Sequence, residues 1–386
     1  MQLKNSRLLL FCICICSISS CCTTKNLKVT QPRPGITAIK FLGEYDIPFA
    51  FTYNNTTVGG LSGIDYDAKH DCYYMICDDR SSINPARFYT ANIFLTEKGI
   101  DSVRFTSVNY MLQPGGTVYP NNKQDPYNTP DPEAMRYDPL RNQLVWNSEG
   151  ERFIKEKDTV LSDPAIRIIN MNGKFADSFS IPSNLRMQAM EKGPRQNSVF
   201  EGMSFADNYK TLFISVEEPL YEDGPRADLT ENDAYIRILE FDVDNKKNIS
   251  QYAYKLAPVA FPPDPATTFK INGVPDILSI GNDALLVIER SFSAGHTESN
   301  IKIFMADLSR ATDIKNISSL WKNKNFIAAT KKLLLNMDEL GIYTDNIEGV
   351  TFGPVLPNGH KTLLFVSDNN FNPLEKTQLL LFEVVE

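Results

Sequence analysis

The sequence predicts an all-β fold, and two observations lead to this prediction. A short pattern recurs five times along the 386 residues: an acid or serine, two small or apolar residues, and later an apolar strand that ends in an acid. The composition also favours strands over helices, because the chain holds 23 Phe and 16 Tyr and aromatic side chains pack well on the pleated surface of a sheet. Apolar content of 42% and charged content of 22% are ordinary for a globular protein with a large core.

The repeated unit is clearest at 201–205 (EGMSF), which leads through a polar turn to the apolar run 211–216 and then to Glu217. The five units start at positions 62, 133, 201, 276 and 348, at intervals of 71, 68, 75 and 72 residues. In the first three units the opening and closing residues are separated by 16 positions: 62 and 78, 133 and 149, and 201 and 217. The fourth closes at Glu289 through a shorter turn, and the fifth closes at Asp368 through a longer one.

A period near 70 residues fits a four-stranded propeller blade with long loops and is too long for one unit of a helical solenoid. The remaining strands can be found between the units; for example, an Asn172-Gly173 hairpin turn separates the strands expected at 165–169 and 175–181. The fifth unit lacks one strand, so we expect the segment 36–46 to pair with 378–384 and close the ring. We predict a single β-propeller of five four-stranded blades, with six blades as the alternative.

One stretch, 318–340, departs from the strand pattern. Phe326, Ala329, Leu333 and Met337 recur at three- and four-residue steps, which is the spacing of an amphipathic helix. We therefore predict a short helical insertion that covers the edge of one blade.

The first twenty residues predict a targeting signal and not a part of the fold. Lys4 and Arg7 precede an apolar run at 8–18 that is too short to span a bilayer. The run ends in Ile-Ser-Ser before Cys21, which resembles the processing site of a bacterial lipoprotein; an ordinary secretory leader is the alternative. We expect a signal peptide at 1–20, a lipidated Cys21, a tether over 21–35, and a propeller domain over 36–386 anchored to the bacterial cell envelope.

Charge and cysteine usage exclude some functions. The formal charge is −8, which does not resemble the basic surface of a nucleic-acid-binding protein. Cys72 and Cys77 are the two cysteines outside the leader and its junction; in one strand they would lie about 16 Å apart, too far for a disulfide. The chain has three histidines, so it offers few candidates for a Ser-His-Asp triad. A catalytic mechanism with His296 as its one histidine has no further support in the sequence.

The repeat predicts two rings of side chains at one mouth of the central channel. In a propeller the first strand of each blade lines the channel and the second runs antiparallel to it, so the residue opening strand one meets the residue closing strand two. The expected inner ring is Ser62, Glu133, Glu201, Asp276 and Glu348. The expected outer ring is Asp78, Glu149, Glu217, Glu289 and Asp368.

Nine carboxylates that converge in this way need compensation, because like charges a few ångströms apart raise one another's pKa values. A Ca²⁺ ion, which takes six to eight oxygen ligands, would suit the inner ring. Arginines are the second remedy, and four of them lie within three residues of a ring member: Arg80, Arg136, Arg152 and Arg290. We expect Arg80, Arg152 and Arg290 to contact an anionic substrate. The alternative is that these acids only cap turns at the ends of strands and bind neither metal nor substrate.

At these residues the chain resembles the phytase-like family described by its esterase-like activity. The segments that carry the resemblance are 200–203 (FEGM) and 347–350 (IEGV), together with Ser-Glu at 148–149 and Ser-Asp at 367–368. The inner ring is also similar to the central Ca²⁺ site of the five-bladed calcium-dependent apyrases. Asp276 departs from that pattern, because it stands where a hydroxyl residue is expected.

The resemblance implies a Ca²⁺-dependent hydrolase that acts on a small phosphorylated or otherwise esterified molecule. Glu217, Glu149 and Asp368 would supply the general base. The alternative is a binding propeller without catalysis, in which a structural calcium locks the blades together. We expect a monomer with no nucleic-acid partner in either case.

Overall fold

The computed structural model describes residues 35–155 and 158–386. The leader at 1–20, Cys21 and almost all of the tether at 21–35 therefore lie outside the described residues. Residues 36–386 form one compact unit. No helical segment in the described ranges has the length and hydropathy needed to cross a membrane.

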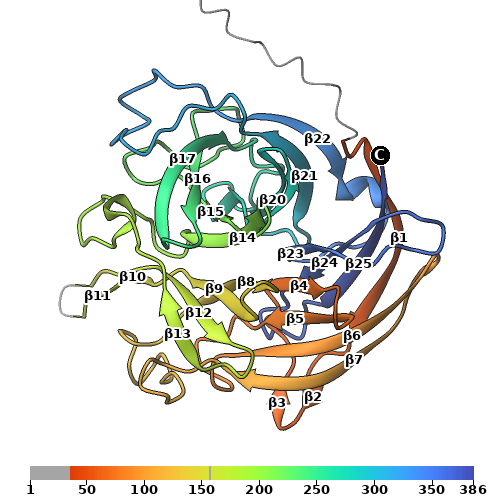
Figure 1. The fold of residues 1–386 in the computed structure, drawn as a ribbon. Coiled ribbons are helices and arrows are strands. Elements are labelled where there is room, and N and C mark those ends of the chain that lie inside the picture. The colour runs from red at the N-terminus through yellow and green to blue at the C-terminus, as the bar shows by residue number, and fades with distance from the viewer. Residues whose placement is uncertain (1–34, 156–157) are drawn as a thin grey trace, which may run out of the picture. The chain divides into compact units, whose positions relative to one another are not determined.

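Five antiparallel sheets of the described residues follow one another around a ring, as predicted (Figure 1). Blade one is β4 (Gly63–Asp67), β5 (Cys72–Ile76), β6 (Arg87–Thr96) and β7 (Gly99–Tyr110). Blade two is β8 (Pro132–Asp138), β9 (Gln143–Ser148), β12 (Ala165–Asn170) and β13 (Phe175–Ser178). Blade three is β14 (Phe200–Ala206), β15 (Thr211–Val216), β16 (Tyr235–Asp242) and β17 (Lys247–Lys255).

Blades four and five depart from this regular pattern: blade four has an additional strand, and blade five takes its fourth strand from the other end of the chain. Blade four is β19 (Ile277–Gly281), β20 (Ala284–Ser293), β21 (Asn300–Asp307) and β22 (Thr330–Asn336), and a fifth strand, β18 (Lys270–Gly273), pairs with the far end of β20. Blade five is β23 (Ile347–Phe352), β24 (Thr362–Ser367), β25 (Thr377–Val385) and, from the other end of the chain, β1 (Ala38–Ile47). Two small hairpins complete the strands: β2 (Thr52–Tyr53) with β3 (Thr56–Thr57), and β10 (Glu151–Phe153) with β11 (Val160–Ser162).

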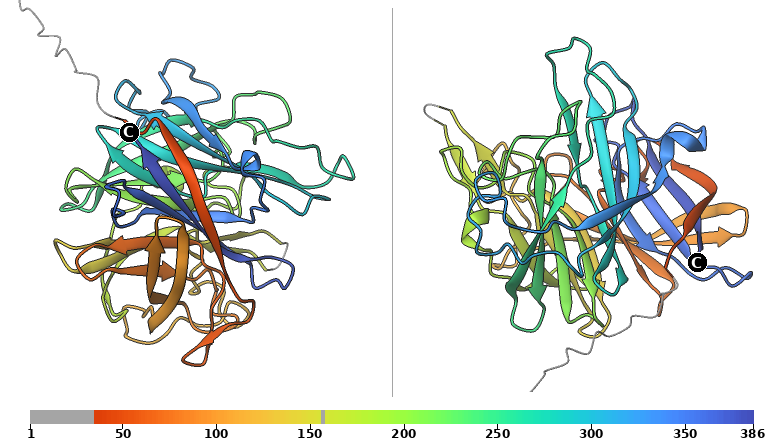
Figure 2. Two further views of the ribbon diagram at one scale, coloured as in Figure 1. Left: turned by 90° about the vertical axis from the view of Figure 1, so that its right-hand side faces the viewer. Right: turned by 90° about the horizontal axis from the view of Figure 1, so that it is seen from above.

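The predicted closure of the ring is confirmed. β1 pairs antiparallel with β25 from Ala38 opposite Val385 to Ile47 opposite Thr377, and Figure 2 shows the two strands side by side. This pairing gives the hydrogen-bonding groups of β25 a partner and makes β1 the outer strand of blade five, so that both ends of the described chain meet in one blade.

The core lies between neighbouring blades. One apolar cluster joins Val145 and Ile168 of blade two to Met203 and Leu212 of blade three. Another joins Ile288 of blade four to blade five. The strands form because apolar residues occupy both faces of these sheets, so that each blade is covered by the next one.

The helical insertion predicted at 318–340 is wrong. The segment 330–336 forms β22, the fourth strand of blade four, and the one helical turn in the stretch is a 3₁₀ turn at Met337–Leu340. The other 3₁₀ turn among the described residues is Ser183–Leu185. Leu333 and Leu335 lie opposite Phe304 and Ile303 of β21, so pairing with a strand edge overrides the local helical spacing.

Candidate metal centre

The strands that open each blade bring acids to one mouth of the channel. β4, β8, β14 and β23 lie near the centre of the ring (Figure 1). Glu133, Glu201 and Glu348 are each the second residue of β8, β14 and β23, and Ser62 directly precedes β4. Because the equivalent strands run in the same sense around the ring, their first residues share one end of the channel.

Two groups of carboxylates meet at this mouth, and Glu133 belongs to both. Ligand oxygens of Asp78, Asp131 and Glu133 lie within 4.8 Å of one another, and so do those of Glu133, Glu149 and Glu201. All but Asp78, which is partly exposed, are buried. The structure therefore brings together four of the acids predicted for the two rings.

Asp131 is a member of this cluster that the repeat analysis missed. It lies two residues before Glu133, and residues two apart in a strand point to the same face. Asp131 could have been predicted from the alternation of side chains in Asp-Pro-Glu at 131–133. The repeat does not predict it.

Burial and mutual repulsion raise the pKa values throughout the cluster. Burial, followed by the charges of Glu201, Asp78 and Glu149, raises the pKa of Glu133 well above its usual range. Burial and the charges of Asp131 and Glu217 raise the pKa of Glu149 to about 8. Burial and the charge of the neighbouring Glu149 also raise the pKa of Glu201 well above its usual range. A site of this kind either holds protons or binds a cation.

Ser62 and Glu348 occupy their predicted positions but have protein partners. The Ser62 hydroxyl donates to the backbone oxygen of Glu133 at 2.6 Å. The Glu348 carboxylate accepts from Arg290 Nη1 at 2.6 Å and from Asn346 Nδ2 at 2.9 Å. Both residues therefore help to shape the mouth. Burial raises the pKa of Glu348, and Arg290 acts against that shift.

A cavity opens at this mouth, and Arg290 is the one predicted arginine that lines it. Its Nη2 donates to Glu217 at 2.9 Å while Nη1 donates to Glu348, so it joins two blades' acids. Arg80 pairs with Glu151 at 2.8 Å and lies 3.5 Å from Asp131. Arg152 donates instead to backbone oxygens, including that of Gln188 at 2.9 Å, and does not line the cavity.

The ring assignment in blade four is off by one residue. Met203 lies opposite Ile214 in blade three, with Glu201 two residues before Met203 and Glu217 three residues after Ile214. Ile277 lies opposite Val287 in blade four, so the same offsets lead to Pro275 and Arg290. Arg290 therefore takes the outer-ring position that was assigned to Glu289.

A shift of one residue turns a strand side chain to the other face of the sheet. Glu289 accordingly points away from the mouth, where it accepts hydrogen bonds from Tyr254 at 2.7 Å and Asn272 at 2.8 Å and pairs with Lys331. Asp276 is likewise separated from the other inner acids. The sequence spacing failed here because the first strand of blade four is interrupted between β18 and β19.

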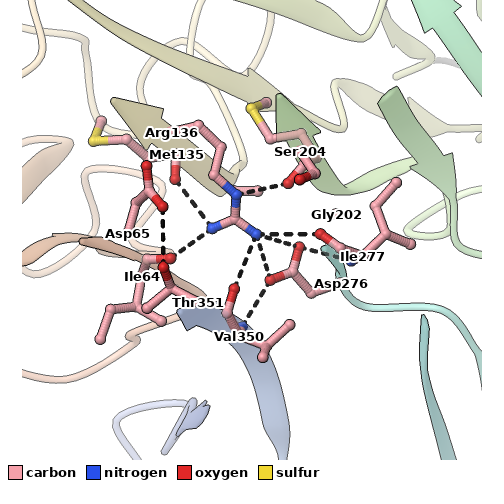
Figure 3. Close-up of polar contacts among 12 residues, drawn as sticks. Ile64, Asp65, Met135, Arg136, Gly202, Ser204, Asp276, Ile277, Val350 and Thr351 are labelled. Carbon is pink, nitrogen blue, oxygen red and sulfur yellow. Dashed lines mark hydrogen bonds and ion pairs between the residues drawn. The ribbon is translucent and has the colours of Figure 1, made fainter. Parts of the chain in front are cut away.

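Asp276 forms a buried ion pair with Arg136 inside the channel (Figure 3). Arg136 Nη2 donates to both carboxylate oxygens at 2.8 and 2.7 Å. The same guanidinium donates to backbone oxygens of Met203, Ile64 and Val350 at 2.7, 2.5 and 3.3 Å. Arg136, itself in β8, thus contacts the first strands of the other four blades.

The acids open into a cavity of about 610 Å³. Glu217 and Asp368 line its wall together with Asp78, Asp131, Glu133 and Glu201. Glu149 lies behind this wall, where it accepts a hydrogen bond from the backbone N–H of Val199 at 2.5 Å. Of the three predicted catalytic acids, Glu217 and Asp368 can therefore meet a ligand directly.

Comparison with solved structures returns propeller enzymes at low similarity. An endo-arabinase from Bacteroides thetaiotaomicron matches with a TM-score of 0.43 and 10% identity, over 89% of this chain and 97% of that chain. A gluconolactonase from Xanthomonas campestris matches with a TM-score of 0.37 and 9% identity, over 84% of this chain and 71% of that one. The periplasmic gluconolactonase of Pseudomonas aeruginosa matches with a TM-score of 0.35 and 10% identity, over 86% and 87%.

No curated protein matches the sequence. A family model does: the phytase-like model described as "Esterase-like activity of phytase" matches residues 56–371, a range that contains both rings and the acid cluster. The five-bladed ring is consistent with this family. The chain therefore belongs to the phytase-like family, as the Glu-Gly units and the Ser-Glu and Ser-Asp strand ends predicted.

Proposed function

We propose that the chain is a calcium-binding propeller hydrolase that cleaves a phosphoester or a related ester at the channel mouth. The observation that carries the proposal is the position of Glu133, whose buried carboxylate belongs to two clusters of acids with oxygens within 4.8 Å of one another. Family membership supports the esterase-like part of the proposal.

The donor set fits a hard cation. All the candidate ligands are carboxylates, with neither histidine nor cysteine among them, and Ca²⁺ prefers oxygen ligands. Burial and mutual repulsion raise their pKa values, and a bound cation would favour their ionised form. Either group of three would hold an ion: Asp78, Asp131 and Glu133, or Glu133, Glu149 and Glu201.

The residues around the cluster can move protons. A bound Ca²⁺ ion would neutralise charge and orient the ester oxygen. Glu217 would accept the proton of the attacking water at a carboxylate oxygen, while Arg290, 2.9 Å away, holds that carboxylate in place. Burial, followed by the charge of Glu348, raises the pKa of Asp368 well above normal, so that a protonated Asp368 would donate to the departing alkoxide oxygen.

The proposal is tested on purified residues 36–386 with phosphoester and carboxyester substrates, with and without a calcium chelator. We expect turnover that chelation abolishes and Ca²⁺ restores. Glu133→Gln should abolish metal binding and turnover, whereas Glu217→Gln should spare binding and lower turnover about 10²-fold or more. Glu97→Gln, at an exposed turn, is the matched control. Calcium binding without turnover of any ester would favour the non-catalytic binding propeller.

We also propose that the protein is anchored to the cell envelope through a lipid on Cys21. The support is the charged start, the short apolar run and the Ile-Ser-Ser-Cys junction of the leader. Cys21→Ser should release the protein from the membrane fraction or leave its leader uncleaved, as seen by fractionation and intact mass. Unchanged membrane association and processing in the variant would show that the anchor is a different one.

A further inference from the structure

One wall of the cavity is apolar, and blade four builds it. β20 is ten residues long, whereas its counterparts β5, β9, β15 and β24 have five or six. The extra residues run beyond the ring position of Arg290 and pair with β18, so that Ile271 lies opposite Phe292. Phe292 lies two residues beyond Arg290 in β20, which corresponds to about 7 Å of strand. The apolar wall therefore begins close to the acids at the channel mouth.

Aromatic rings cover this extension on the cavity side. Phe269 and Phe292 line the cavity with their ring centroids 6.4 Å apart. His296 also lines it and stacks on Phe261, with centroids 5.4 Å apart. Phe269 is 53% exposed and Leu374, on the loop after Asp368, is 86% exposed. Large apolar side chains left open beside a polar centre are typical of a ligand subsite.

The charges of the cavity point to the same kind of ligand. Among the described residues that line it, nine are carboxylates: Asp78, Asp131, Glu133, Glu201, Glu217, Asp345, Glu348, Asp368 and Glu375. Arg226 and Arg290 are the two arginines that line it, and both are paired, Arg226 with Glu218 at 3.1 Å and Arg290 with Glu217 and Glu348. Asp368 is protonated in the proposed mechanism, so not all nine acids carry a charge. Neither arginine is free to pair with a further anion, and a ligand with several anionic groups would therefore meet too few positive charges.

We infer that the preferred substrate is a small ester with a single anionic or polar ester group and an apolar, ring-bearing portion that packs on Phe269 and Phe292. The ester group faces the acids, and the ring lies against the blade-four wall. This inference rests on the proposed function and narrows its substrate class. It excludes polyphosphorylated compounds as the preferred substrates.

The test compares three probes in the presence of Ca²⁺: phenyl phosphate, glycerol 2-phosphate and inositol hexakisphosphate. Phe269→Ala and Phe292→Ala should each lower kcat/KM for phenyl phosphate about tenfold, mainly through KM, and change that for glycerol 2-phosphate less than about twofold. Inositol hexakisphosphate should be the poorest of the three substrates. Phe94→Ala, which removes a phenyl ring that is 44% exposed and does not line the cavity, is the matched control.

Calorimetric binding of phenylphosphonate separates this inference from the proposed function. Binding that Phe269→Ala weakens about tenfold, without turnover of any ester, would support the subsite and overturn the hydrolase. The two phenylalanine changes could instead lower turnover equally for both monophosphates, or leave it unchanged. Either result would overturn the subsite but would not contradict the hydrolase. A preference for inositol hexakisphosphate would also overturn the subsite.

Discussion

At the scale of single residues, Arg136 connects the first strands of the blades at the centre of the ring. Its guanidinium is buried, pairs with Asp276, and donates to backbone oxygens of β4, β14 and β23. Burial raises the pKa of Asp276 to about 6 although Arg136 lowers it. The pair therefore compensates the cost of placing a carboxylate inside the channel.

Arg136→Met should destabilise the protein by about 3–5 kcal/mol, because it leaves Asp276 buried without its counter-charge. Urea denaturation measures the loss. Asp276→Asn added to Arg136→Met should restore part of the stability, since the uncompensated charge is then gone. An Arg136→Met protein as stable as its parent would contradict the central role given to this residue.

A second residue-scale prediction concerns Glu218, beside the cavity. Burial and Glu217 raise its pKa from 4.5 to about 7, against the lowering effect of Arg226 and Arg195. The folded state thus binds this proton more tightly than the unfolded state does. The contribution of Glu218 to stability is greatest below about pH 4.5 and is lost as the pH rises toward 7.

Glu218→Gln removes this titration. Between pH 4.5 and 8 its unfolding free energy should rise relative to the parent by up to about 3 kcal/mol, measured by urea denaturation across the range. The variant Glu97→Gln, at an exposed turn, should track the parent at every pH. A constant difference between Glu218→Gln and the parent would mean that Glu218 titrates alike in both states.

At the scale of elements, the closure of blade five by β1 follows from the need to pair an open sheet edge. Ile39 of β1 lies opposite Val384 and is 8% exposed. Its side chain packs in the cluster that joins blades four and five. The strand therefore contributes both hydrogen bonds and apolar burial to the ring.

Deleting residues 22–46, or changing Ile39 to Asp, should lower the Tm by several degrees or more in calorimetry. The deletion reopens the edge of β25, and the substitution buries a charge in an apolar cluster. Lys40→Gln, at an exposed neighbour on the same strand, should leave the Tm nearly unchanged. Unaltered melting after the deletion would show that β1 does not stabilise the ring.

At the scale of the whole molecule, the sequence predicts the fold well because the repeat carries it. Five apolar hairpins at similar spacing can bury their faces only against one another, which leads to the ring. The helix expected at 318–340 failed because its apolar residues also fit a strand, and the edge of β21 supplied a partner. No local pattern contains that long-range pairing.

The site was predicted less completely than the fold. Glu133, Glu149, Glu201 and Asp78 follow from the repeat, and the structure brings their oxygens together. Asp131 needed strand alternation. Arg290 was predicted as an arginine near the outer acids, but its place in the outer ring needed the true register of blade four. A ring position depends on a register set by pairing, so a shift of one residue in one irregular strand moved Asp276 and Glu289 out of the cluster.

The measurement that tests the central claim most directly is calorimetric titration of Ca²⁺ into residues 36–386, paired with thermal melting. We predict saturable binding to the parent, a Tm that chelator lowers and Ca²⁺ restores by mass action, and loss of both effects in Glu133→Gln but not in Glu97→Gln. Absence of Ca²⁺ binding, with Glu133→Gln melting like the parent in chelator and in Ca²⁺, would contradict the metal centre.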